Sequence, residues 1–142
     1  MILLDVNLLL YAHNSRAREH ERAYLWLNEL LSGPATVGFS WETILGFLRL
    51  ATSPKLFARP FELDEAIGII DAWLAQDNVV IVGPHDRHWR ILVGLLPKSR
   101  SRGSLIMEAH LAALAIEHGA ALCTNDRDFL RFPGLKVEFP LQ

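Results

Sequence analysis

Short apolar runs alternate with longer segments of helical periodicity along the whole chain. Runs typical of buried strands lie at residues 1–5, 35–40, 78–82, 120–126 and 135–139. Apolar residues recur at helical spacing over 17–31, 41–53, 62–76, 86–96 and 103–120, and 127–132 form a helical turn. This order predicts an α/β fold, with a mostly parallel sheet of four to five strands covered on both faces.

Local signals mark several boundaries of these elements. Ser40 is a good N-cap for the helix that follows it. Proline residues mark a loop at 53–60, and basic and small residues mark another at 97–104. The pattern assigns no element to residues 6–16. We find no repeat and no interdomain linker, so we expect one domain over residues 1–142.

Composition narrows the class of protein. The chain is 51% hydrophobic and 21% charged, which is typical of a globular protein. Its net charge of −2 leaves only a local basic patch for nucleic acid. The single cysteine, Cys123, excludes an internal disulfide and suits a core position in a reducing compartment. The first residues lack the features of a signal peptide, and no segment is long enough to span a membrane. We therefore expect a cytoplasmic protein.

One helical segment carries charge where apolar residues are expected. Glu108 and His110 alone interrupt the apolar run over residues 105–116. Residues three and four positions from Glu108 share its helix face, and none of them is Lys or Arg. A buried carboxylate without a partner is costly. We therefore expect a partner from elsewhere in the chain, a cation or water.

Four acids fall at comparable places in the predicted fold, namely Asp5, Glu42, Glu108 and Asp126. Asp5 and Asp126 end strands, Glu42 opens a helix after a strand, and Glu108 lies early in the helix leading to the fourth strand. Sites in open α/β sheets form at the carboxyl ends of strands, where these acids would repel one another unless cations neutralise them. Oxygen ligands suit Mg²⁺ or Mn²⁺, which in turn suit phosphodiester hydrolysis. The six histidines are scattered along the sequence and show no zinc spacing.

Each acid also has a structural interpretation. Glu42 sits where a helix dipole favours negative charge. Asp126 and Asp128 can cap the helical turn after them, and for Asp128 we favour capping. Asp5 can be an N-cap, although its place inside an apolar run makes this the weaker interpretation.

Three segments together resemble a known family: LLDVNLLLYA, SWETILGFLRLATSPKLFARP and GSLIMEAHLAALAIEHGAALCTNDRDFLRFPGL. In this order they resemble PIN domains, specifically the VapC-type toxins of bacterial toxin–antitoxin systems. The resemblance implies a PIN-like α/β/α sandwich and an Mg²⁺- or Mn²⁺-dependent endoribonuclease. It places the metal and catalytic acids at Asp5, Glu42, Glu108 and Asp126. It also implies a homodimer, an RNA substrate and a cognate VapB-type antitoxin, with Asn7 and Thr124 supporting the acids.

One position departs from the family pattern, since Glu108 stands where these proteins usually have Asp. The extra methylene moves the carboxylate by about 1.5 Å, and metal geometry is sensitive at that scale. An active enzyme is the favoured interpretation. The alternative is a catalytically weakened PIN-like domain that binds RNA or antitoxin without cutting.

The basic loop before this helix is a candidate RNA contact. Arg100 and Arg102 precede Gly103 and Ser104, whose backbone N–H groups open the helix. A helix N-terminus beside basic residues favours phosphate. The structural alternative is a solvated loop.

Three other enzyme or signalling classes fit poorly. A dehalogenase-like phosphatase needs a second Asp at position 7, where this chain has Asn7. A receiver domain needs an Asp at the end of the third strand, and residues 78–85 contain none. No G-x-S-x-G elbow indicates a serine hydrolase, and Cys123 has no evident basic partner.

Overall fold

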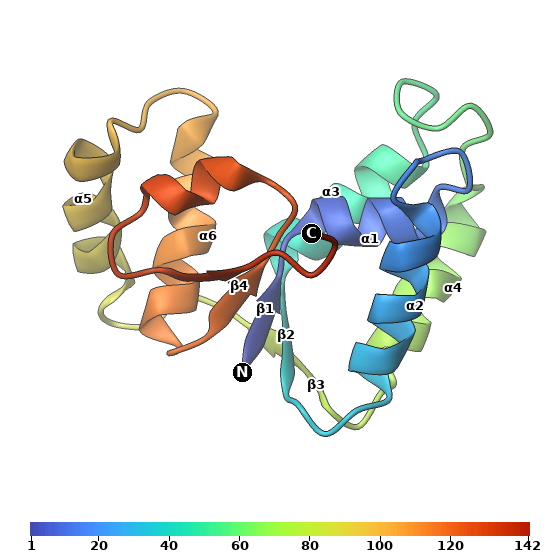
Figure 1. Cartoon of the computed structure of the whole chain (residues 1–142), viewed down its shortest axis with the longest axis horizontal. Coiled ribbons are helices and arrows are strands. Elements are labelled where there is room, and N and C mark those ends of the chain that lie inside the picture. Colours follow the sequence, from blue (N-terminus) through green and yellow to red (C-terminus); the bar gives the residue numbers. More distant parts are fainter.

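Five parallel strands form one sheet in the order β3-β2-β1-β4-β5. The structure is a computed structural model that describes residues 1–142 (Figure 1). The strands are β1 Ile2–Leu4, β2 Val37–Ser40, β3 Val79–Val82, β4 Ala121–Cys123 and β5 Lys136–Glu138. All five predicted strands are therefore confirmed, with shorter bounds than the apolar runs suggested.

Helices cover both faces of this sheet (Figure 1). They are α1 Val6–His13, α2 His20–Leu31, α3 Trp41–Ala51, α4 Leu63–Leu74, α5 His88–Ser99, α6 Leu105–Glu117 and the 3-10 helix η1 Arg127–Arg131. The first four helices pack on one face, whereas α5, α6 and η1 pack on the other. The α/β/α sandwich is confirmed.

Successive side chains of the central strands point to opposite faces of the sheet, and both faces are buried. This explains why the sequences of these strands are continuous apolar runs. Leu4 points into the core beneath α1–α4, whereas Leu3 points into the core beneath α5 and α6. In the neighbouring strand, Cys123 and Leu122 divide in the same way. Because both faces of the sheet are buried, neither side of these strands needs polar residues. Cys123 is buried, as predicted.

Two segments differ from the sequence prediction. Residues 6–13 form α1, which we did not predict because an almost wholly apolar helix shows no polar face and hence no period. The helix α5 also continues through Pro97 into the predicted loop at 97–104. It ends at Ser99, two residues after Pro97, and Arg100 then takes a left-handed conformation with φ 55°.

The helix α6 is apolar because it is buried along most of its length. Its fully or nearly fully buried residues are Ala109, Leu111, Ala112, Ala113, Leu114 and Ala115. It packs between the sheet and α5. None of the helices is both long and apolar enough to cross a membrane.

The strand order reverses between β1 and β4. After β1 the chain builds β2 and β3 outward on one side, and it then returns to place β4 on the other side of β1. In open α/β sheets, the crevice outside the carboxyl ends at such a reversal is the usual place for a ligand. Asp5 follows β1 here, and residues 124–126 follow β4.

Candidate active site

Asp5 lies at this reversal and serves as the N-cap of α1. One carboxylate oxygen accepts hydrogen bonds from Thr124 Oγ1 at 2.6 Å and Asn7 Nδ2 at 3.0 Å. The other accepts the backbone N–H of Val6 at 2.7 Å. The capping interpretation of Asp5 is thus confirmed, and the same carboxylate faces the crevice. Burial raises the pKa of Asp5 and nearby Asp126 adds to the effect, although the hydrogen bonds oppose it.

Thr124 joins the ends of β1 and β4. Its side chain is fully buried. Its hydroxyl donates to Asp5 and accepts the backbone N–H of Asp126 at 3.0 Å. Beside it, Asn7 Oδ1 accepts the backbone N–H of Asn125 at 3.3 Å. The positions of Asp5 and Asp126 are therefore fixed relative to each other through one hydroxyl and one amide.

Three further carboxylates crowd together next to Asp5. Ligand atoms of Glu108, Asp126 and Asp128 all lie within 4.8 Å of one another. Partial burial raises the pKa of Glu108, and the charges of Asp126, Asp128 and Asp5 raise it further. Its Oε2 is buried and has no hydrogen-bond partner. We refer to Asp5, Glu108, Asp126 and Asp128 as the crowded acids.

The preference for Asp128 as a cap was wrong. Asp126 caps η1 by accepting the backbone N–H of Asp128 at 2.9 Å. The carboxylate of Asp128 is left free to join the crowded acids, where Arg131 lies 3.8 Å from it.

Glu42 is held on the opposite wall by α3. Ser40 caps this helix by accepting the N–H of Thr43, as predicted. Thr43 Oγ1 also donates to the carbonyl of Leu4 at 3.0 Å, which ties the first turn of α3 to the end of β1. The carboxylate of Glu42 lies 2.9 Å from His110 Nε2. Partial burial raises its pKa, but backbone hydrogen bonding and His110 outweigh burial and bring the pKa below its usual value.

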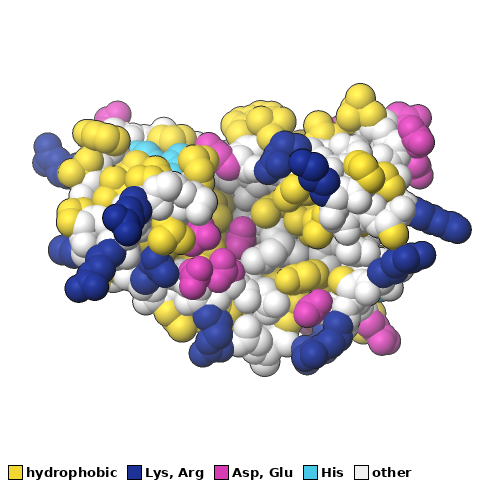
Figure 2. Space-filling view, turned by 90° about the horizontal axis from the view of Figure 1, so that it is seen from above, with side chains coloured by type: hydrophobic (Ala, Val, Ile, Leu, Met, Phe, Trp, Pro, Cys, Tyr) yellow, Lys and Arg dark blue, Asp and Glu magenta, His cyan; other side chains and the backbone are white.

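Three of the four predicted acids, namely Asp5, Glu42 and Glu108, line one cavity of about 270 Å³. The fourth, Asp126, lies beside Glu108. Figure 2 looks onto this side of the molecule and shows acidic side chains gathered along a hollow, with Lys and Arg side chains around it. The predicted convergence of acids is therefore present in the structure.

The basic residues of the predicted RNA contact lie apart from the acid cavity. Arg100 and Arg102 are exposed and line a separate hollow of about 520 Å³, which shares no lining residue with the acid cavity. Arg49 lines the acid cavity instead. Arg49 lies seven residues after Glu42, and two turns of a helix bring such residues to one face. That spacing was the signal available in the sequence.

The histidines are not all scattered in space. His110 contacts Glu42, and its Nδ1 lies 2.9 Å from His88 Nε2 on α5. His110 was visible in the sequence as the second polar residue of the apolar run in α6, but its neighbours come from distant segments.

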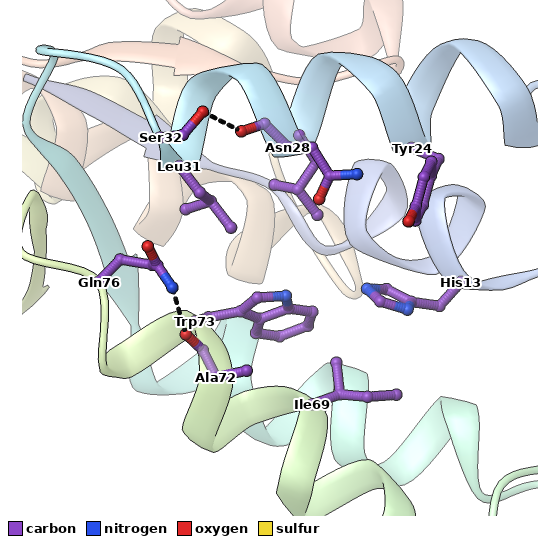
Figure 3. A pocket seen from close by; sticks show the side chains of 10 residues that line it. His13, Tyr24, Asn28, Leu31, Ser32, Ile69, Ala72, Trp73 and Gln76 are labelled. Atoms are coloured by element: carbon purple, nitrogen blue, oxygen red, sulfur yellow. Dashed lines mark hydrogen bonds between the residues drawn. The ribbon is translucent and has the colours of Figure 1, made fainter.

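A third hollow, of about 540 Å³, lies between α2 and α4 (Figure 3). His13 at the end of α1 and Trp73 on α4 line it, and no carboxylate does. Burial lowers the pKa of His13 to about 4, so His13 is neutral at pH 7. Without acidic groups, this hollow is unsuited to a divalent cation.

The acid cavity, in contrast, offers only oxygen donors at close spacing. A hard divalent cation such as Mg²⁺ or Mn²⁺ prefers oxygen ligands. The unpartnered Glu108 Oε2 and the mutual repulsion of the crowded acids are both features that a cation would relieve. The donor set therefore fits a divalent metal ion.

Known proteins share this sequence and fold. The sequence model of the PIN domain family matches residues 2–135. The ribonuclease VapC37 of Mycobacterium tuberculosis is 42% identical over 140 residues, which cover 99% of this chain and 97% of that protein. The ribonuclease VapC33 of the same species is 38% identical, over 100% of this chain and 99% of that protein.

Solved structures with the same fold are more distant in sequence. VapBC2 from Rickettsia felis, bound to a promoter DNA fragment, matches with a TM-score of 0.70 at 21% identity, over 97% of this chain and 98% of that one. VapBC-1 from nontypeable Haemophilus influenzae matches with a TM-score of 0.69 at 17% identity, over the whole of both chains. From the family match and the close relatives together, this chain belongs to the PIN domain family and, within it, to the VapC group.

Proposed function

We propose that this protein is a metal-dependent endoribonuclease and the toxin of a toxin–antitoxin pair. Two curated relatives, which match this chain over nearly their full length, are named ribonucleases. The observation that carries the proposal is the set of crowded acids at the strand-order reversal, with Glu42 on the facing wall. A structural role alone does not account for this crowding, in which neighbouring acids help to raise the pKa values of Asp5 and Glu108.

The ligands we propose for Mg²⁺ or Mn²⁺ are Asp5, Glu42, Glu108 and Asp126, with Asp128 as an addition from the structure. A bound cation of this kind supplies Lewis-acid catalysis for phosphodiester hydrolysis. Thr124 and Asn7 hold the carboxylate of Asp5 in a fixed orientation. Preorganised ligands of this sort avoid the cost of ordering side chains when the cation binds.

For RNA binding we propose the cavity wall in addition to the basic loop predicted from the sequence. Arg49 is exposed and lines the cavity with Glu42 and Glu108, so its guanidinium is suited to a phosphate beside the acids. Arg100 and Arg102 line their own hollow, and we propose for them a contact to more distant parts of the RNA.

Glu108 supports an active site rather than a weakened one. Its longer side chain still brings an oxygen within 4.8 Å of ligand atoms of Asp126 and Asp128. Its Oε2 has no hydrogen-bond partner in the protein. The substitution of Glu for the usual Asp therefore leaves the acid cluster assembled.

For partners we propose an antitoxin and a second copy of this chain. The solved structures of similar fold are described as VapBC assemblies, which supports an antitoxin partner. Two exposed apolar pairs, Trp41 with Leu45 on α3 and Trp89 with Val93 on α5, offer surface for a homodimer. Light scattering of the purified chain tests the dimer, with Trp89→Glu as the disrupting variant.

The deciding experiment is cleavage of total cellular RNA by the purified chain. It is run with Mg²⁺, with Mn²⁺ and with EDTA, beside Asp5→Ala and Glu108→Asp. Asp71→Ala, which removes an exposed acid on α4, is the matched control. Cutting that needs metal and disappears only in Asp5→Ala supports the proposal. Cutting in EDTA, or unchanged cutting by Asp5→Ala, overturns it.

A further inference from the structure

Four side chains from three helices form a continuous line behind the acid cavity. Glu42 of α3 lies 2.9 Å from His110 Nε2 on α6, and His110 Nδ1 lies 2.9 Å from His88 Nε2 on α5. His88 Nδ1 in turn lies 3.9 Å from Glu117 Oε1 near the end of α6. The line begins at the cavity wall and ends between α5 and α6.

Exposure decreases along this line away from the cavity. The side chain of Glu42 is 43% exposed, that of His110 16%, that of His88 9% and that of Glu117 3%. Glu117 is anchored by two backbone N–H groups at the start of α5, those of His85 and Arg87, at 2.8 and 2.9 Å. The line is therefore fixed at its buried end and open at the end that carries Glu42.

The donors and acceptors can be assigned from Glu42 inward. An ionised carboxylate only accepts, and a neutral imidazole has one N–H and one bare nitrogen. If His110 donates to Glu42 from Nε2, its Nδ1 is bare and must accept from His88 Nε2. His88 Nδ1 is then bare, and it is buried without a hydrogen-bond partner. With both rings neutral and His110 donating to Glu42, each ring carries its proton on Nε2.

The contact between His110 and Glu42 is close but not ideally directed. The two atoms are within hydrogen-bond distance, yet the buried Nε2 has no well-aligned acceptor. The nearest carboxylate oxygen is Glu42 Oε1, so a hydrogen bond from His110 would engage this oxygen and not Oε2.

The geometry points to His110 as a positioning residue for Glu42, with His88 fixing the tautomer of His110. This inference rests on the proposed function, because it concerns how one acid of that site is presented. Glu42 is long and half exposed, so a free side chain would sample several rotamers. One oxygen held by His110 restricts those rotamers and presents the other oxygen to the cavity. Outer partners of this kind commonly orient metal-binding carboxylates.

The first test measures the tautomers directly, in the metal-free chain. Long-range ¹H–¹⁵N correlation spectra of the labelled protein report which ring nitrogen carries the proton. We expect Nε2–H for both His110 and His88, and we expect His88→Phe to mix the tautomers of His110. An Nε2 of His110 that carries no proton would overturn the inference, since it would then have nothing to donate to Glu42.

The second test is a double-mutant cycle on Mn²⁺ binding, followed by the resonance signal of free Mn²⁺ in the absence of RNA. His110→Phe removes the donor and keeps a ring, whereas His110→Gln retains an N–H near the position of Nε2. We expect His110→Phe to weaken binding about tenfold, within the range for outer partners, and His110→Gln to restore most of the affinity. In a Glu42→Gln background, His110→Phe should have no further effect.

His20→Phe is the matched control, because His20 also bonds through a ring nitrogen, to the carbonyl of Tyr11, on another helix. It should leave Mn²⁺ affinity unchanged. Equal weakening by His110→Phe with and without Glu42 would show a merely structural contact and overturn the inference. Failure to cut RNA would count against the proposed function alone, since neither test uses RNA. If the wild type bound no Mn²⁺, the proposed metal site would fall and the tautomers would decide the positioning role.

Discussion

Asp5 and Glu42 line the same cavity, yet opposite kinds of neighbour surround their carboxylates. On the wall of Asp5, other acids stand close by, and the pKa values of Asp5 and Glu108 are raised, first by burial and then by that repulsion. On the wall of Glu42, a histidine stands beside the acid, and the net effect lowers its pKa. One wall is electrostatically strained in the free protein, and the other is already paired.

The difference shows how one site combines two kinds of ligand. The crowded acids store unfavourable energy that a divalent cation would release, so they provide the driving force for binding. Glu42 gains little from neutralisation, because His110 already contacts it, and it contributes through its orientation instead. Substitutions on the two walls should therefore have different consequences.

The largest difference is expected in catalysis. Asp5→Asn keeps a good N-cap for α1 but removes the charge at the centre of the site. We expect kcat/KM for RNA cleavage to fall by more than about 100-fold, the upper range for loss of an outer partner. Glu42→Gln should lose less. Comparable losses in the two variants, with unchanged circular dichroism, would contradict a division of roles between the walls.

Metal binding should stabilise the fold by way of the crowded wall. At a Mn²⁺ concentration of a hundred times its Kd, the free energy of unfolding should rise by about 2.7 kcal/mol. EDTA should reverse the rise, which thermal unfolding followed by calorimetry can measure. Glu108→Gln should shrink this stabilisation at a fixed Mn²⁺ concentration, whereas the exposed control Asp71→Asn should not.

Two buried threonines allow a matched comparison of what supports each wall. Thr124→Val removes one of the hydrogen bonds to Asp5 and leaves the N–H of Asp126 without its acceptor, and Thr43→Val removes the hydrogen bond to the carbonyl of Leu4. Each should lower the free energy of unfolding by about 2 kcal/mol in urea titrations. Only Thr124→Val should also weaken Mn²⁺ binding, because it removes the shortest of the hydrogen bonds that orient Asp5. If Thr43→Val weakened Mn²⁺ binding more than Thr124→Val does, the wall of Glu42 and not that of Asp5 would dominate metal binding.

The smallest effect concerns pH and has opposite signs on the two walls. Because the pKa of Glu108 is raised in the folded chain, its charge destabilises the fold at pH 7, and this cost disappears as pH falls through that pKa toward 4.5. Because the pKa of Glu42 is lowered, its stabilising contribution is present above pH 4.5 and is lost only as pH falls through the lowered value.

Without metal at pH 7, Glu108→Gln should therefore be more stable than the wild type and Glu42→Gln less stable. Each difference should be about 0.5 kcal/mol after allowance for solvent screening. Urea unfolding at a series of pH values measures both. A destabilised Glu108→Gln at pH 7 would show that the crowded wall is not strained.

The sequence contained enough to predict the sheet and the acids, because both depend on local patterns. Apolar runs marked every strand, and the reversal rule of parallel sheets then brought Asp5, Glu42 and Glu108 to one edge. The helix α1 was missed since burial on all sides removes the polar face that reveals a helical period. The bounds of α5 were missed because Pro97 normally ends a helix.

The rest of the site depends on packing between distant helices. His88 meets His110 only because α5 packs on α6, and no spacing in the sequence records that contact. The sequence places Asp126 and Asp128 in the same turn and does not show which of them caps η1. That depends on the backbone conformation at Asp126, which lets its side chain accept the N–H of Asp128. Arg100 and Arg102 were favoured for their clustering, but clustering along the chain does not determine which hollow a side chain lines.

The pairing of β1 with β4 has a consequence for the quality of the folded population. Leu3 pairs with Leu122 and Leu4 with Cys123, so the same register that buries these residues also sets Asp5 beside Thr124, whose hydroxyl accepts the backbone N–H of Asp126. A slip of one residue would shift one acid by about 3.3 Å and turn Leu122 toward the wrong face of the sheet. Molecules in which the acids are misplaced by such a slip would thus also have a misfolded hydrophobic core and would unfold. The hydrophobic packing that selects the correct register therefore also selects the correct placement of the acids. Well-folded molecules with a misplaced active site should be scarce.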